Sequence, residues 1–135
     1  MKTQSADRFF RLCAAAGAAS AAVAVALGAF GAHGLRHVIS PEMLTVFETG
    51  VRYEMYHAIG MIAAGMAGSF SPTGRRWLLL AGSAFGLGTI LFSGSLYALA
   101  FSDRGWIGAI TPVGGLLFLA GWVFLAVGFA FTEEG

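Results

Sequence analysis

Small and apolar residues fill four long stretches of this chain that contain no Asp, Glu, Lys or Arg. The stretches are Leu12–Leu35, Met55–Gly74, Trp77–Ser102 and Gly105–Thr132, with 24, 20, 26 and 28 residues. A helix of about 20 apolar residues crosses the roughly 30 Å hydrocarbon core of a bilayer. The pattern therefore predicts an all-α, integral membrane four-helix bundle, with spans at approximately 11–33, 53–71, 77–101 and 107–131.

An amphipathic pattern precedes the second span. Residues 40–42, Ser-Pro-Glu, are typical of a helix start, because they supply a capping hydroxyl, a proline at the first helical position and an acid in the first turn. Apolar residues then recur at helical spacing on one face: Leu44, Phe47, Val51 and Met55. We therefore expect an interfacial amphipathic helix at approximately 41–52 that runs into the second span and bends at Gly50.

Composition agrees with a membrane protein that consists of one domain, residues 1–135. Hydrophobic residues make up 57% of the chain, charged residues only 11%, and the mean hydropathy is +0.75. The net charge is +1 and no run of Lys and Arg is present, so nucleic acid is excluded as a partner. Cys13 is the only cysteine, which rules out an intramolecular disulfide and a thiolate metal cluster.

The basic residues near the span ends indicate an orientation. Five of them lie on the side of the two termini (Lys2, Arg8, Arg11, Arg75 and Arg76), against three on the other side (Arg36, Arg52 and Arg104). Lys and Arg are enriched in cytoplasmic segments, so both termini are predicted to be cytoplasmic.

Polar residues that interrupt the apolar stretches gather near one side. Because the chain direction alternates from span to span, the end of the first span, the start of the second, the end of the third and the start of the fourth share one leaflet. We expect a polar cluster there, with Arg52 paired to Glu48 or Glu54, and with Tyr53 and Tyr56 where the second span enters the bilayer. Its candidate binding residues are His33, His37, Glu48, Arg52, Tyr53, Glu54, Tyr56, His57, Ser93, Ser95, Tyr97 and Thr111.

Metal binding is an alternative for the histidines. His33 and His37 are four residues apart and share a helix face, and Glu54 with His57 has the spacing of half a di-iron motif. A second half-motif is missing, so hydrogen bonds from these histidines to backbone or carboxylates are the favoured interpretation, and no metal or other cofactor is predicted. No nucleophile and base stand at a known catalytic spacing, so we do not expect an enzyme.

Small residues recur at a spacing of four within the stretches. Such small-xxx-small pairs let helix backbones approach closely in a bilayer, where hydrophobic exclusion does not drive helices together. We expect interhelical contacts at four pairs: Gly17 with Ala21, Ala24 with Gly28, Ala64 with Gly68, and Gly82 with Gly86.

The sequence also resembles a known family. The segments GAFGAHGL at 28–35, FETGVRYEMYHA at 47–58, FSGSLY at 92–97 and ITPVGG at 110–115, followed by Gly121-Trp122, are similar to those of the domain-of-unknown-function 423 family. The resemblance implies a small four-span protein of the bacterial inner (plasma) membrane. It implies no reaction, cofactor or substrate.

Two classes of function remain. The favoured one is an interaction or accessory component that uses the polar cluster, with membrane lipids, other membrane proteins or a second copy as partners. The alternative is a protein that binds or transports a small ligand, ion or metal at the same cluster. Four short spans leave little room for a transport pathway, which favours the first class.

Overall fold

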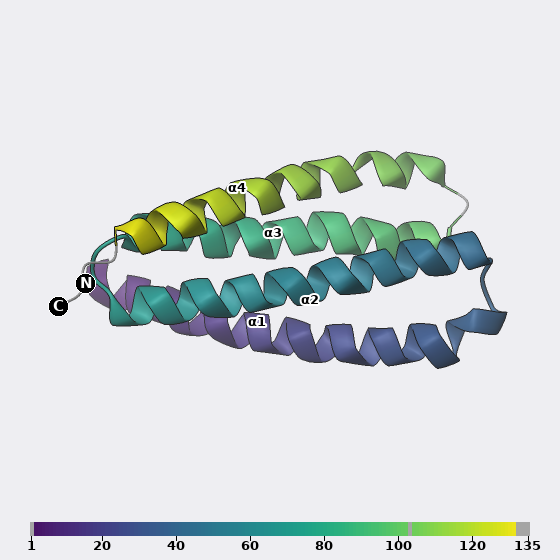
Figure 1. The fold of residues 1–135 in the computed structure, drawn as a ribbon, viewed down its shortest axis with the longest axis horizontal. Coiled ribbons are helices and arrows are strands. Elements are labelled where there is room, and N and C mark those ends of the chain that lie inside the picture. The colour runs from purple at the N-terminus through teal and green to yellow at the C-terminus, as the bar shows by residue number, and fades with distance from the viewer. Residues whose placement is uncertain (1, 103, 132–135) are drawn as a thin grey trace.

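The computed structural model describes residues 2–102 and 104–131 and consists of antiparallel helices. The long helices are α1 (Lys2–His33), α2 (Pro41–Phe70), α3 (Arg75–Ala100) and α4 (Thr111–Ala130); short 3-10 helices, η1 (Leu35–His37) and η2 (Gly105–Ala109), precede α2 and α4. Chain order is also spatial order, since α2 packs between α1 and α3, and α4 packs on α3 (Figure 1). The predicted all-α four-helix bundle is confirmed.

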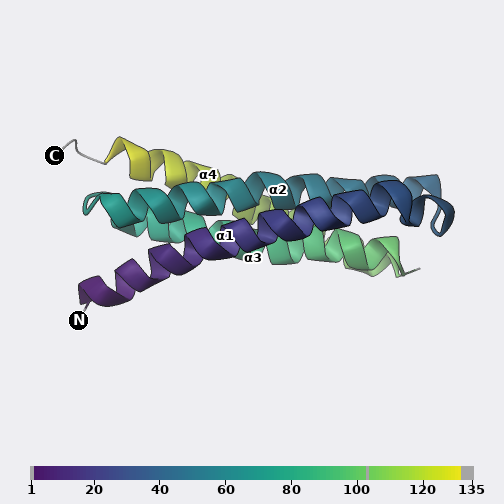
Figure 2. The same ribbon diagram turned by 90° about the horizontal axis from the view of Figure 1, so that it is seen from below.

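The two ends of the bundle differ in what they contain. The start of α1, the α2–α3 turn and the end of α4 lie at one end, which we call the terminal end (Figure 1). The connections from α1 to α2 and from α3 to α4 lie at the other, which we call the loop end. Figure 2 shows that α1 crosses its neighbours obliquely, whereas α2 follows the long axis of the bundle.

Three segments are long and apolar enough to cross a membrane by length and composition: Gln4–His37, Arg75–Ala100 and Gly105–Ala130. The helix α2 has 30 residues, more than the about 20 that a span needs, but it is not among these three segments and carries charged and polar side chains along its first half. It lies in the bundle beside the apolar helices α1 and α3.

The start of α2 follows the predicted capping. The hydroxyl of Ser40 accepts a hydrogen bond from the backbone N–H of Met43 at 3.3 Å, and Pro41 occupies the first turn. The amphipathic segment at 41–52 runs directly into the following residues, as expected, because Pro41–Phe70 is one continuous helix. Its apolar side is covered by the bundle: Phe47 is 2% exposed and packs with Leu35 and Ala100.

Gly50 serves close packing, and α2 continues through this position as one helix. A Cβ atom there would lie 2.7 Å from the ring of Tyr97, so only glycine lets α3 come this close. Three of the predicted small-residue positions act in the same way. A Cβ at Gly17 would meet the backbone of Ala58, and those at Gly68 and Gly82 would meet α1.

The core centres on an aromatic ring held between glycines. Phe85 of α3 is fully buried, and a Cβ at either Gly60 of α2 or Gly121 of α4 would lie under 3 Å from its ring. This arrangement brings three helices within contact of one side chain. Its cluster comprises Phe10, Cys13, Met61, Ala64, Leu78, Ala81, Phe85, Phe118 and Leu125.

Replacement of Gly114 by alanine tests this close packing. The added Cβ would lie 2.5 Å from the backbone nitrogen of Phe92, so α3 and α4 must move apart. We expect Gly114→Ala to lower the free energy of unfolding by about 1–3 kcal/mol, measured by thermal unfolding in detergent. The matched control is Gly94→Ala, whose Cβ meets nothing within 4 Å. Equal stability of the two variants would contradict the proposed packing.

Candidate functional site

One face of α2 carries polar groups that bond to all three other helices. Gly50, Glu54 and His57 follow one another at spacings of four and three, so they line one side of the helix. The backbone carbonyl of Gly50 and the side chains of Glu54 and His57 each accept hydrogen bonds from neighbouring helices. We call these groups, with their partners, the buried network.

The carboxylate of Glu54 is the acidic member of this network. It is only 6% exposed, and each of its oxygens accepts one hydrogen bond. The hydroxyl of Ser20 in α1 donates to Oε1 at 3.0 Å, and the phenol of Tyr97 in α3 donates to Oε2 at 2.5 Å. Both donors are neutral, and Glu54 forms no ion pair within the described residues.

His57 is fixed on both ring nitrogens. Its Nδ1 lies 2.6 Å from the backbone carbonyl of Tyr53, and its Nε2 accepts a hydrogen bond of 3.1 Å from the indole N–H of Trp122. Because Tyr53 offers only an acceptor and Trp122 only a donor, the ring is neutral with its proton on Nδ1. The ring also stacks on Phe118, with centroids 3.3 Å apart. Both nitrogens are therefore occupied in the folded chain.

The serines of α3 find partners, as serines without access to water must. Ser93 is 1% exposed and donates to the carbonyl of Gly50 at 2.7 Å, which joins α3 to α2. The hydroxyl of Ser95 lies 2.8 Å from the carbonyl of Phe92 and 2.6 Å from the hydroxyl of Thr111, which joins α3 to α4.

Glu54 and His57 lie at mid-depth in the bundle. His57 stacks on Phe118, which is at the midpoint of the fourth charge-free stretch. Glu54 lines a groove together with Thr89, which is at the midpoint of the third. If these stretches span the bilayer as predicted, the carboxyl group sits near its centre.

The middle of α2 lies at this depth. The helix begins at Pro41 and is about 45 Å long, so Met55, the first residue of the second charge-free stretch, is near its middle. Tyr53 and Tyr56 accordingly lie halfway along α2. The start of the second span at residue 53 stays a prediction.

The remaining candidates do not join the buried network. His33, His37, Glu48 and Arg52 are exposed, and neither Glu48 nor Arg52 forms an ion pair in the described parts of the chain. The expected pairing of Arg52 with Glu48 or Glu54 is therefore not observed. Within the same parts, no three His, Cys, Asp or Glu side chains are grouped so that they could hold a metal ion.

Three grooves adjoin these residues. One of about 450 Å³ between α1 and α2 contains Glu48 and Arg52; its other lining residues are Leu27, Gly28, Gly31, Phe47 and Val51. One of about 630 Å³ between α1 and α3 contains Glu54. The third, about 700 Å³, lies between α2 and α4 and is lined largely by aromatic side chains, among them Tyr53, Tyr56 and Trp122.

Two members of the network escaped the sequence analysis. Ser20 is the only hydroxyl-bearing residue in Leu12–Leu35, and a lone hydroxyl in an apolar stretch is a signal that a partner exists on another helix. Trp122 lies near the middle of its stretch, where an indole N–H also needs an acceptor.

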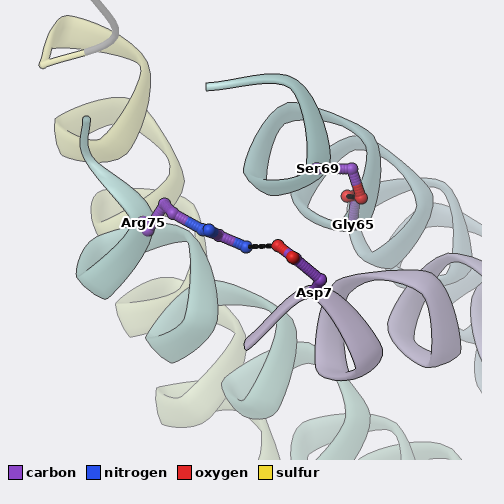
Figure 3. Close-up of polar contacts among 4 residues, drawn as sticks. All are labelled: Asp7, Gly65, Ser69 and Arg75. Atoms are coloured by element: carbon purple, nitrogen blue, oxygen red, sulfur yellow. Dashed lines mark hydrogen bonds and ion pairs between the residues drawn. The ribbon is translucent and has the colours of Figure 1, made fainter. Parts of the chain in front are cut away.

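The terminal end holds an ion pair that the sequence analysis also missed. Arg75 at the start of α3 donates to Asp7 of α1 (Figure 3), and its guanidinium lies 5.0 Å from the ring centre of Phe10. Nearby, the hydroxyl of Ser69 bonds back to the carbonyl of Gly65 at 2.8 Å. Asp7 is the only acid among the basic residues of the first two turns, which is the signal for this contact.

Comparison with known proteins identifies relatives. The model of a family described as "Protein of unknown function (DUF423)" matches residues 27–115, which include Glu54, His57, Ser93 and Thr111. A UPF0382 membrane protein of Staphylococcus haemolyticus is 46% identical over 100 residues, covering 74% of this chain and 80% of the relative. The UPF0382 inner membrane protein YgdD of Escherichia coli is 40% identical over 103 residues, covering 76% and 77%. No solved structure matches the chain.

The phenol of Tyr97 provides a test of the buried network. We expect Tyr97→Phe to lower the free energy of unfolding by about 1–3 kcal/mol, because Glu54 loses a buried hydrogen-bond donor while the packing of the ring is kept. Thermal unfolding in detergent measures the effect. Tyr56→Phe is the control, since Tyr56 is 51% exposed. A loss of stability no larger than that of the control would show that the bond to Glu54 adds nothing.

Proposed function

The chain belongs to the DUF423 family of membrane proteins, also named UPF0382, and we propose that it is an interaction component of the membrane that binds a second copy of itself. The binding surface is the groove between α1 and α2 that contains Glu48 and Arg52, which we call the charged groove. We assign no catalytic step and no cofactor to the chain. A second chain does not reach the buried network, because Glu54, His57 and Ser93 are at most 6% exposed.

The main support for this proposal is the position of two exposed charged side chains, those of Glu48 and Arg52. Glu48 and Arg52 line the charged groove beside Gly28 and Gly31, which belong to the apolar stretch of α1. Gly28 lies seven residues before the end of that stretch, about 10 Å along the helix. Charged side chains at such a depth nearly always face protein or water and pair with opposite charge. A partner chain in the groove would supply that pairing.

Small residues in the same groove support the approach of a helix. A Cβ at Gly28 would meet only the end of Val51 at 3.5 Å, and Gly31 faces the ring of Phe47. Neither position presents a side chain of its own to a partner. In membranes, surfaces of this kind let two helices come close enough for backbone contact.

A second copy fits the arrangement of charges. Glu48 and Arg52 are four residues apart on α2 and carry opposite charges. When two copies are related by a two-fold axis, the acid of each copy can therefore pair with the base of the other. Helical side chains lean toward the helix N-terminus, so the long side chain of Arg52 reaches back to the height of Glu48. With two α2 helices side by side and parallel, each Arg52 can therefore meet the Glu48 of the other copy.

We also propose that the protein resides in the bacterial inner membrane with both termini in the cytoplasm. The relative YgdD of Escherichia coli is described as an inner membrane protein. The terminal end holds more of the basic residues, and the start of α1 and the end of α4 share that end. Both observations support a cytoplasmic terminal end.

Cross-linking in membranes tests the charged groove. We expect Val51→Cys, in a Cys13→Ala background, to form a disulfide-linked dimer on mild oxidation, because Val51 lines this groove together with Glu48 and Arg52. Adding Glu48→Arg should reduce the dimer about tenfold, since it sets like charges against each other, and adding Arg52→Glu as well should restore it.

The control for this experiment is Leu119→Cys in the same background, a position on α4 that is 65% exposed. Equal cross-linking at residue 119 would indicate random collision. A charge exchange that fails to restore the dimer, or a cross-link only to a different protein, would overturn self-association through this groove.

The orientation is tested with reporter fusions. A green fluorescent protein after residue 135 should fluoresce, because it folds in the cytoplasm, and alkaline phosphatase at the same position should be inactive. Alkaline phosphatase fused after Ser40, at the loop end, should be active. The reverse pattern of activities would place the termini outside the cytoplasm.

A further inference from the structure

The carboxyl group of Glu54 lacks a compensating charge. It is buried at mid-depth, and its two hydrogen-bond donors, Ser20 and Tyr97, are neutral. The nearest basic residue in sequence, Arg52, is exposed and paired with no acid in the described segments. A carboxylate at this depth is costly unless a cation accompanies it, and an ionisable group inside a membrane usually marks a functional site.

Glu54 also faces an open groove. The groove between α1 and α3 has a volume of about 630 Å³, within the range of sites for small organic molecules. Three hydroxyl-bearing residues, Ser20, Ser83 and Thr89, line the same groove as Glu54. The hydroxyl of Thr89 is buried without a hydrogen-bond partner among the described residues, so it offers an acceptor to a ligand.

Most of the remaining lining is apolar and opens outward. Val23 of α1 and Leu87 and Ile90 of α3 line the groove and are exposed. Since these helices are predicted to span the bilayer, the groove opens sideways toward the lipid. A ligand that reaches it must be soluble in the membrane.

The single carboxylate and the apolar walls of the groove indicate which kind of cation it can bind. A divalent metal prefers several carboxylates, and Glu54 is the only one in the groove. A bare alkali ion would leave most of the 630 Å³ empty and would make no use of the apolar walls. An ammonium group on an apolar body matches both parts, because it donates hydrogen bonds to the carboxylate and to Thr89 while its body contacts Val23, Leu87 and Ile90.

We propose that Glu54 is the anionic centre of a second site, separate from the charged groove, that binds protonated amines with an apolar body from the bilayer. The amine enters between α1 and α3, and its ammonium group forms an ion pair with the Glu54 carboxylate. Ser20 and Tyr97 hold the two carboxylate oxygens in place by donating one hydrogen bond to each.

The test uses the full chain in lipid nanodiscs and 3-phenylpropylamine as the probe. Isothermal titration at pH 7, where the amine is protonated, should show one saturable site per chain. The Glu42→Gln variant should bind alike, because Glu42 is an exposed acid at the start of α2 that does not line this groove. Glu54→Gln should show no saturable binding.

A second variant keeps the test interpretable if Glu54→Gln fails to fold. Thr89→Val keeps the shape of the side chain and removes the hydroxyl without a partner, so it should weaken binding about tenfold in a folded bundle. The neutral analogue 3-phenylpropanol should not bind. Saturable binding of the alcohol, displacement of the amine by Na⁺ at equal concentration, or full binding by Glu54→Gln or Thr89→Val would each overturn the proposal, as would no binding by the unaltered chain.

Discussion

The structure depends on one requirement, that the polar face of α2 must be satisfied inside the bundle. No water reaches the interior of a bilayer, so a polar group there is stabilised only by a partner on another helix or on its own backbone. Glu54 meets this requirement through Ser20 and Tyr97, and His57 through Trp122. These bonds tie α2 to α1, α3 and α4 at nearly the same depth. They fix the register of the bundle more specifically than apolar contact does.

Close packing by glycine makes these bonds possible. Hydrogen bonds between helices need donors and acceptors about 3 Å apart, so the backbones must approach closely. The bond from Ser93 reaches the carbonyl of Gly50, the same residue at which a Cβ would collide with Tyr97. Tyr97 in turn donates to Glu54 one turn further along α2. The missing side chain at residue 50 and the polar contacts beside it therefore form one arrangement.

The sequence was sufficient to predict the helices, their antiparallel order and the capped start of α2, because charge-free length and capping residues act locally. The depth of α2 was not predictable in the same way. Glu54 and Arg52 were treated as residues outside the apolar core, whereas the partners that admit Glu54 to the interior lie far away in the chain, at Ser20 and Tyr97. Such tertiary pairing is invisible to a count of charges. The solitary hydroxyl of Ser20 was the only local sign of it.

The predicted single cluster separates into two sets, and helical geometry accounts for the division. At about 100° per residue, Gly50, Glu54 and His57 fall within about 60° of one another around α2, while Glu48 and Arg52 fall on the opposite side. The first set faces the bundle and is bonded; the second faces outward and is exposed. Proximity in sequence suggested one site, but rotation around the helix makes two. A polar segment of a membrane helix can thus stabilise its own bundle with one face and present charge to a partner with the other, and the two roles are separable by substitution because no side chain takes part in both.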